Sequence, residues 1–178
     1  MRRFVYCLAL VVSCFVLGGC GYHLASETQT TSLLAGKTIS IPMWRSKIYR
    51  PNLEALLTGS LIDEFALRTG GMVVAEDVAE LLLTGTIVTY TTVAISFTAA
   101  DQVKEYRATM TVEATLAEKR SQKVLWKGML SASQDYIAIN DPALPNRIAL
   151  QQNSEDAALR EIDRKIAQQL FQKMSENF

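Results

Sequence analysis

"EYRATMTVEATL", residues Glu105 to Leu116, alternates polar and apolar side chains without a break. Its apolar positions are Tyr106, Ala108, Met110, Val112, Ala114 and Leu116, and its polar positions are Glu105, Arg107, Thr109, Thr111, Glu113 and Thr115. An alternation of apolar and polar side chains over this length is typical of a strand with one buried face and one solvent-exposed face. The stretch therefore predicts a long antiparallel strand on which the rest of the fold is built.

The stretches on either side repeat this alternation. In residues 81–97, alternate positions that would share one face of a strand carry Leu81, Leu83, Ile87, Val93, Ile95 and Phe97. In residues 124–132, the corresponding positions carry Val124, Trp126, Leu130 and Ala132. Turns around 99–101 and 119–121 would join the three strands into an antiparallel meander. A short strand is predicted at 37–43, where Pro42 limits its length, and a short β-like run at 72–75.

Two amphipathic helices complete the pattern. The first is predicted at 52–68, with Gly70-Gly71 past its end and with its apolar residues at helical spacing: Leu53, Leu56, Leu57, Leu61 and Phe65. Residues 140–153 carry two prolines and predict an irregular loop, so the last helix should begin at Asn153 or Ser154. Its apolar stripe is Leu159, Ile162, Ile166, Leu170 and Met174. The expected fold is α+β, a two-layer sandwich with two helices packed on one face of a mainly antiparallel four- to five-stranded sheet.

The amino terminus has the order of a secretory signal. Basic residues at 1–3 precede an apolar run at 4–17 and two small residues, Gly18 and Gly19. The run is short for a membrane span of about 20 residues, so it predicts a signal peptide at 1–19; an uncleaved anchor or a buried helix is the alternative. Residues 20–36 then form the mature amino terminus and a Ser/Thr-rich linker, and 37–178 a single domain.

Cys20 would become the first residue of the mature chain. "LGGC", residues 17–20, resembles the bacterial lipobox, in which this cysteine is lipidated before cleavage. The resemblance implies acyl chains on Cys20, and two or more such chains anchor a protein stably to a membrane. A free thiol is the alternative. Gly21 follows where an Asp would imply retention in the inner membrane, so outer-membrane placement is expected.

Charge and residue chemistry argue against several functions. Removing Arg2 and Arg3 leaves 16 basic against 18 acidic residues, a balance that does not favour nucleic-acid binding. The one histidine, His23, adjoins the predicted anchor, and no Gly-rich phosphate loop follows a strand. We therefore expect no enzyme, metal or cofactor. The carboxylate pairs expected on solvated helix or loop surfaces are Asp63–Glu64, Asp77–Glu80 and Glu161–Asp163, and a hydrolase using one of them is the third possibility.

Two surfaces are candidates for binding. The loop "MWRSKIYRP", residues 43–51, interleaves aromatic side chains with cations, namely Trp44, Arg45, Lys47, Tyr49 and Arg50. Such a mixture suits an amphiphile with anionic headgroups or a protein surface; alternatively, the aromatic rings only cover the end of the core. The second surface is the threonine-rich outer face of the meander, with Arg107, Lys123 and Lys127.

Three segments carry a family resemblance. "CGYHL" (20–24), "EYRATMTVEAT" (105–115) and "YRPNLEALLTGSLIDEF" (49–65) are similar to the LptE family of lipopolysaccharide-assembly lipoproteins. With the strand, helix, meander, helix order, the similarity spans the mature chain.

The resemblance implies a function. It would be that of a Gram-negative outer-membrane lipoprotein, lipid-anchored on the periplasmic side, that helps fold and plugs the LptD β-barrel and assists lipopolysaccharide delivery to the outer leaflet. The family is thought to bind lipopolysaccharide through basic residues near loop ends. Here the turn at 98–102 has no cation and Gln151-Gln152 stand where a lysine is expected, so Lys104, Arg107 and the 43–51 loop are the candidates. The second candidate function is a free periplasmic lipid-binding or lipid-shuttling lipoprotein without a barrel partner.

Overall fold

The structure is a computed structural model that describes residues 33–34 and 36–175. The predicted signal peptide, Cys20, His23 and most of the linker lie outside these residues. The bounds of the elements are β1 Ile39–Ser40, β2 Arg45–Ser46, α2 Leu53–Thr69, β3 Leu81–Phe97, β4 Val103–Glu118, β5 Val124–Ile137 and α3 Arg147–Ser175. They follow the predicted order except for β2, which lies in the segment predicted as a loop.

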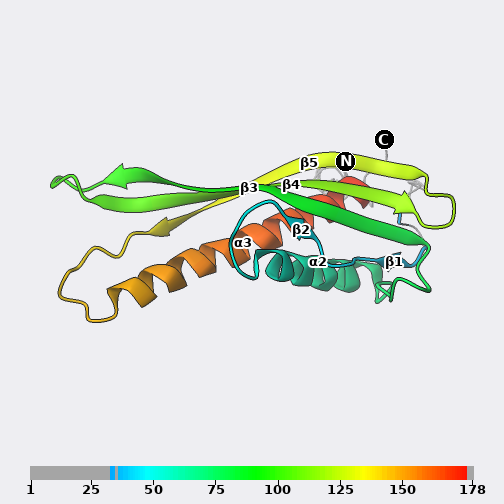
Figure 1. The fold of residues 1–178 in the computed structure, drawn as a ribbon, viewed down its shortest axis with the longest axis horizontal. Coiled ribbons are helices and arrows are strands. Elements are labelled where there is room, and N and C mark those ends of the chain that lie inside the picture. The colour runs from blue at the N-terminus through cyan, green and yellow to red at the C-terminus, as the bar shows by residue number, and fades with distance from the viewer. Residues whose placement is uncertain (1–32, 35, 176–178) are drawn as a thin grey trace, which may run out of the picture. The chain divides into compact units, whose positions relative to one another are not determined.

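The strands form one five-stranded sheet. β3, β4 and β5 make the predicted antiparallel meander, and the short β1 and β2 both pair in parallel with the same edge of β3 (Figure 1). The strand predicted at 37–43 is therefore only two residues long, since Pro42 has no N–H to donate to a ladder. The β-like run at 72–75 contributes one bridge, between Val73 and Ile39.

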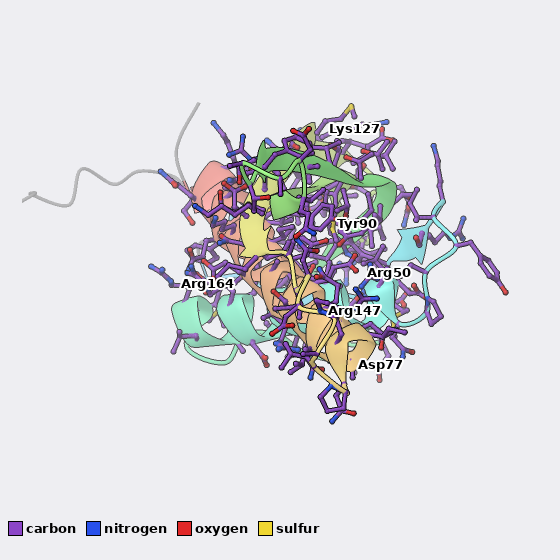
Figure 2. The ribbon with its side chains drawn as sticks, turned by 90° about the vertical axis from the view of Figure 1, so that its left-hand side faces the viewer. Arg50, Asp77, Tyr90, Lys127, Arg147 and Arg164 are labelled. Carbon is purple, nitrogen blue, oxygen red and sulfur yellow. The ribbon has the colours of Figure 1, made fainter. Side chains whose placement is uncertain are left out.

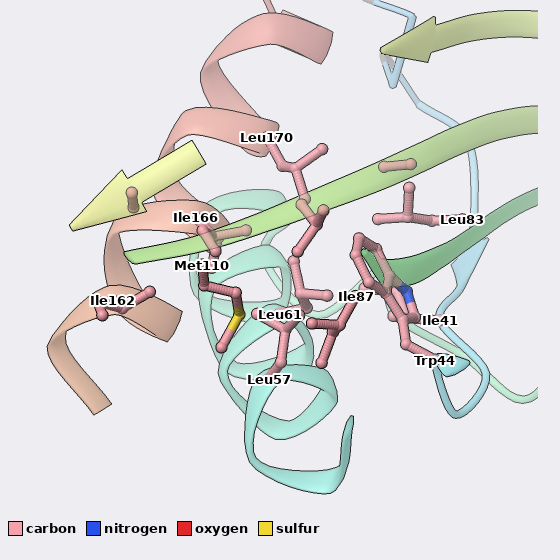
Figure 3. Packing of buried hydrophobic residues seen from close by; sticks show 14 of the residues in the cluster. Ile41, Trp44, Leu57, Leu61, Leu83, Ile87, Met110, Ile162, Ile166 and Leu170 are labelled. Carbon is pink, nitrogen blue, oxygen red and sulfur yellow. The ribbon is translucent and has the colours of Figure 1, made fainter. Parts of the chain in front are cut away.

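Both helices lie on the same face of the sheet (Figure 1). Ala108, Met110, Val112, Ala114 and Leu116 of β4 are fully buried beneath them, which confirms the alternation of that strand. Figure 3 shows Leu57 and Leu61 of α2 facing Ile166 and Leu170 of α3 across Met110. The architecture confirms the predicted α+β class. Neither helix of the described part is long and apolar enough to cross a membrane.

The predicted buried face of β3 is wrong beyond Ile87. Val93 and Phe97 are 54% and 58% exposed, although they share parity with buried Leu81 and Leu83. A register shift between Ile87 and Thr89 leaves an extra residue in β3, which moves the side chains of Thr89–Ala94 to the opposite face, and two further shifts precede Phe97. Tyr90 packs against the core in their place. Val124 is exposed for the same reason. β4 and β5 shift register between Leu116 and Ala117, and this leaves an extra residue in β5 between Trp126 and Val124.

The last helix begins earlier than predicted. α3 starts at Arg147 rather than near Ser154, and the Leu150 N–H already donates to Asn146 O at 3.0 Å. Pro145 is the last helix breaker, so nothing prevents helix formation after it. The extra turns have few buried residues, and the apolar period on which the prediction relied is therefore missing from them. The first helix, in contrast, lies within one residue of its predicted bounds.

Candidate binding surface

Trp44 positions the predicted binding loop from inside the core. The Trp44 side chain is only 2% exposed, and the backbone N–H of Trp44 donates to Thr58 Oγ1 of α2 at 3.1 Å. The ring lies so close to β3 that a Cβ on Gly85 would be 2.5 Å from Trp44 Cζ3. Only glycine therefore allows this approach. Trp44 fastens the loop to α2 and β3, while ligand contact by its ring stays a prediction.

Arg45, Tyr49 and Arg50 of this loop line an open hollow of about 630 Å³ together with Glu54 of α2, and Lys47 lies outside its lining. Tyr49 is fully exposed and Arg45 and Lys47 also face solvent. No described residue forms a hydrogen bond or an ion pair with the Arg45 or Lys47 side chain. The Lys47 charge contributes, after a hydrogen bond from Lys127, to a lowered pKa of Glu113. These two cations therefore remain available to an anionic ligand.

Arg50 is held by carboxylates of α3. Its Nη1 donates to Glu155 Oε1 and its Nη2 donates to Asp156 Oδ1 at 3.1 Å. The guanidinium also lies 5.0 Å from the centre of the Tyr90 ring, and the Tyr90 hydroxyl donates to Glu155 Oε1 at 2.9 Å. Burial, and after it the hydrogen bond to Glu155, raises the pKa of Tyr90 above its ordinary value. Figure 2 shows Arg50 and Tyr90 together beside α3. This cluster connects the loop to α3, and carboxylates of the domain compensate the charge of Arg50.

Two cations of the meander's outer face, Arg107 and Lys127, are also paired. Arg107 Nε and Nη2 donate to the two carboxylate oxygens of Asp135 on β5, at 2.6 and 2.8 Å, and this hydrogen bonding lowers the pKa of Asp135. Lys127 Nζ lies 2.7 Å from Glu113 Oε1, on the side of the sheet away from the helices (Figure 2). Lys104 is exposed near the β3–β4 turn, and no described side chain pairs with it. Among the meander cations considered, Lys104 and the exposed Lys123 therefore keep uncompensated charges in the part of the chain that the structure describes.

A second open hollow, of about 430 Å³, lies between the sheet and the start of α3. Tyr106 and Tyr136 stack on one side of it with ring centres 5.6 Å apart, and Arg147 and Ile148 line the other. The sequence interpretation placed 147 and 148 in a loop, so it missed this site. The absence of a helix breaker after Pro145 was the available signal.

One member of the predicted carboxylate pair Glu161–Asp163 is buried. Asp163 was expected on the solvated side of the last helix, but it is fully buried and neither carboxylate oxygen has a hydrogen-bond partner. Burial raises its pKa to about 7. Its neighbour Glu161 pairs instead with Arg164. α3 packs against α2 as well as β5, so its buried band is wider than the apolar stripe seen in the sequence.

Other carboxylates have structural roles. Glu80 Oε2 accepts from the Thr38 N–H at 3.0 Å, and Glu64 accepts from Arg68 one turn along α2. Within residues 33–34 and 36–175, no group of three or more His, Cys, Asp or Glu side chains could hold a metal ion. The described surface thus carries cations and aromatic rings on loops rather than converging reactive groups. The described part is thus a two-layer α+β domain whose surface offers cations and aromatic rings for contact with other molecules.

The family follows from the sequence as a whole. The chain belongs to the LptE family, because the family model described as lipopolysaccharide-assembly matches residues 36–174. This is a family of non-enzymatic bacterial envelope lipoproteins, and lipopolysaccharide transport is its general process. No curated protein matches the sequence.

Solved structures support the same fold. The chain is similar to rare lipoprotein B from Shewanella oneidensis, with 18% identity and a TM-score of 0.53 over 78% of this chain and 93% of that one. It is also similar to an uncharacterized lipoprotein B from Nitrosomonas europaea, with 14% identity and a TM-score of 0.50 over 78% and 82% of the two chains. At these identities the likeness concerns the fold alone.

Proposed function

We propose that this chain is an outer-membrane lipoprotein that helps fold and plugs the LptD β-barrel and assists delivery of lipopolysaccharide to the outer leaflet. Acyl chains on Cys20 would hold it at the periplasmic side of the membrane, with residues 1–19 removed as a signal peptide. The Ser/Thr-rich linker would let the domain reach the barrel lumen while the lipid stays in the bilayer.

The observation that carries this proposal is the uncovered polar face of the sheet in a member of this family. Both helices lie on the opposite face (Figure 1), and the outer face carries rows of Thr and Ser joined by the Arg107–Asp135 and Lys127–Glu113 pairs. Thr111 Oγ1 also donates to Ser131 Oγ at 3.2 Å across the strands. Interiors of large membrane barrels are polar, so such a face suits contact with the wall of a barrel lumen.

The same surface disfavours the second candidate function. A protein that carries free lipid must bury acyl chains, which requires an enclosed and mostly apolar cavity. The two hollows described above are open and contain charged side chains such as Arg45 and Arg147. A fixed position inside a larger partner is therefore favoured over shuttling through the periplasm.

Co-purification tests the proposal directly. The full chain with a carboxy-terminal tag, isolated from detergent-solubilised outer membranes of its native bacterium, should bring down a large barrel in a one-to-one ratio. Ser133→Arg places a long charged side chain on the outer face and should reduce the yield of barrel at least about tenfold. Gln169→Arg adds the same charge on the exposed side of α3 and serves as the matched control. A wild-type chain that purifies alone contradicts the proposal.

We propose that lipopolysaccharide contacts Arg45, Lys47 and Lys104, which are the predicted site cations without a carboxylate partner among the described residues, with Tyr49 beside the first two. Arg50 and Arg107 would contribute less, because carboxylates of this chain already compensate their charges. Each cation near an anionic lipid surface contributes roughly 1 kcal/mol. The double variant Arg45→Glu/Lys47→Glu should therefore weaken binding at least about tenfold.

This binding is measured with purified protein and lipopolysaccharide at two salt concentrations. The control is Arg160→Glu/Lys173→Glu, which reverses two exposed charges on α3. Its affinity should stay within about twofold of the wild type, and the loop variant should lose most of the salt dependence. Equal losses in both double variants would mean that only net charge matters and would contradict a site at the loop.

A further inference from the structure

The sheet has two edges, and they are built differently. A free edge exposes backbone N–H and C=O groups that can pair with another chain, so proteins usually protect it with charges, prolines or covering segments. β5 forms one edge, and the part of β3 beyond β2 forms the other.

The β5 edge is protected by α3. Lys165 Nζ donates to Ser133 O at 3.0 Å, and Ser154 Oγ donates to Ile137 O at 3.2 Å. Lys127 and Asp135 also place charges along this strand. Two of its outward carbonyls are thus occupied, and a further strand would have to displace these contacts.

The β3 edge has no such protection beyond β2. β1 pairs with Leu81–Leu82 and β2 with Thr86–Ile87, while from Thr89 onward no segment of residues 33–34 and 36–175 pairs with this side (Figure 1). Residues 81–100 include no charged residue and no proline. Between two register shifts, Thr89–Ala94 pairs regularly with β4, which gives a straight segment of about 20 Å.

The hydrogen bonds of β4 identify the backbone groups that point to this edge. Ala138 N–H donates to Lys104 O at 3.0 Å, so the backbone of Lys104 points to β5. Because this direction alternates along an antiparallel strand, the partners in β3 of Tyr106, Ala108 and Met110 point to the free edge. These partners are Ala94, Thr92 and Tyr90.

We propose that Thr89–Ala94 is a β-augmentation site at which an extended, uncharged strand of the barrel partner adds to the sheet. The absence of charge along 81–100 selects a neutral segment, since a charged residue opposite would find no counterion. The same edge already accepts two strands of this chain, so a further strand would continue an existing ladder. Exposed Val93 and Phe97 offer apolar contact beside it.

The identity of the partner rests on the proposed function. Barrel strands are segments of about ten residues that alternate apolar and polar side chains, and their backbone groups are unpaired until the barrel closes. An open edge on a folding factor would pair with such a strand while the barrel assembles, and the strand would stay paired with β3 in the assembled complex.

Ala94→Pro tests this site in the full chain, because it removes an N–H that points outward and leaves the β3–β4 ladder intact. The co-purified barrel should fall at least about tenfold, while the matched control Ala94→Val keeps the N–H and should retain the barrel. In the wild-type complex, the amide protons of Tyr90, Thr92 and Ala94 should exchange at least about tenfold more slowly than in the free protein. The Asp135 amide, on the protected edge, should not change.

The outcomes separate this inference from the proposed function. A barrel that co-purifies equally well with Ala94→Pro, with no protection of the three amides, overturns augmentation and leaves the plug intact. A wild-type chain without any barrel overturns both. Protection that appears in the free protein and rises with its concentration would show that a second copy occupies the edge, which also overturns the inference. If Ala94→Pro fails to fold, amide exchange in the wild-type complex decides.

Discussion

Asp163 of α3 makes the stability of the domain depend on pH, and its replacement by asparagine should remove that dependence. The side chain is fully buried and its two oxygens lack partners, so ionisation inside the fold is costly. Burial raises its pKa from an ordinary 3.8 to about 7. The folded state therefore holds a proton that the unfolded state releases. The contribution of Asp163 to stability is complete below about pH 4 and falls as pH rises, until the loss levels off above about pH 7.

The size of this effect follows from the two pKa values. Proton linkage between 3.8 and about 7 lowers the free energy of unfolding by about 2.5 kcal/mol between pH 5 and pH 8. If the neutral amide is tolerated as the neutral acid is, Asp163→Asn should be more stable than wild type by about 1.5 kcal/mol at pH 5 and about 4 kcal/mol at pH 8.

Urea unfolding at pH 5, 6, 7 and 8, followed by circular dichroism, measures this difference. Asp63→Asn, at an exposed position of α2, is the matched control and should follow the wild type within about 0.5 kcal/mol at every pH. Groups that titrate in both proteins cancel in the comparison. Equal pH dependence in Asp163→Asn and wild type, or a variant less stable at pH 8, would refute the reasoning.

Three further predictions concern the loop, the core and the anchor. Gly85→Ala should lower the free energy of unfolding by about 1–3 kcal/mol, because the new methyl overlaps the Trp44 ring; the same change at Gly59, where nothing lies within 4 Å, should stabilise by up to about 1 kcal/mol. Arg50→Met leaves two carboxylates without their cation and should lower the free energy of unfolding in urea by about 1–2 kcal/mol. An unchanged free energy of unfolding would show that the two ion pairs do not stabilise the fold. Cys20→Ala should accumulate unprocessed precursor without a lipid mass increment, and normal acylated product would contradict the lipobox interpretation.

The sequence by itself determined the elements whose patterns are local. The alternation along Glu105–Leu116 predicted the buried face of β4 residue by residue, because side chains on a regular strand alternate strictly. The helical spacing and the Gly70-Gly71 stop fixed α2 within one residue. Each of the two helices, and the sheet, has a single apolar face to bury. Few arrangements other than a two-layer sandwich bury all three faces.

Only the tertiary structure decided the details that depend on distant partners. Arg50 meets Glu155, which is 105 residues away in sequence, so its charge looks free until the chain is folded. Asp163 lies at the margin of an apolar stripe, and its burial follows from the packing of α3 against both α2 and β5. A single extra residue after Ile87 moves Val93 to the exposed face, and periodicity cannot reveal such an insertion, because it depends on the register with β4. The same register leaves the edge of Thr89–Ala94 open.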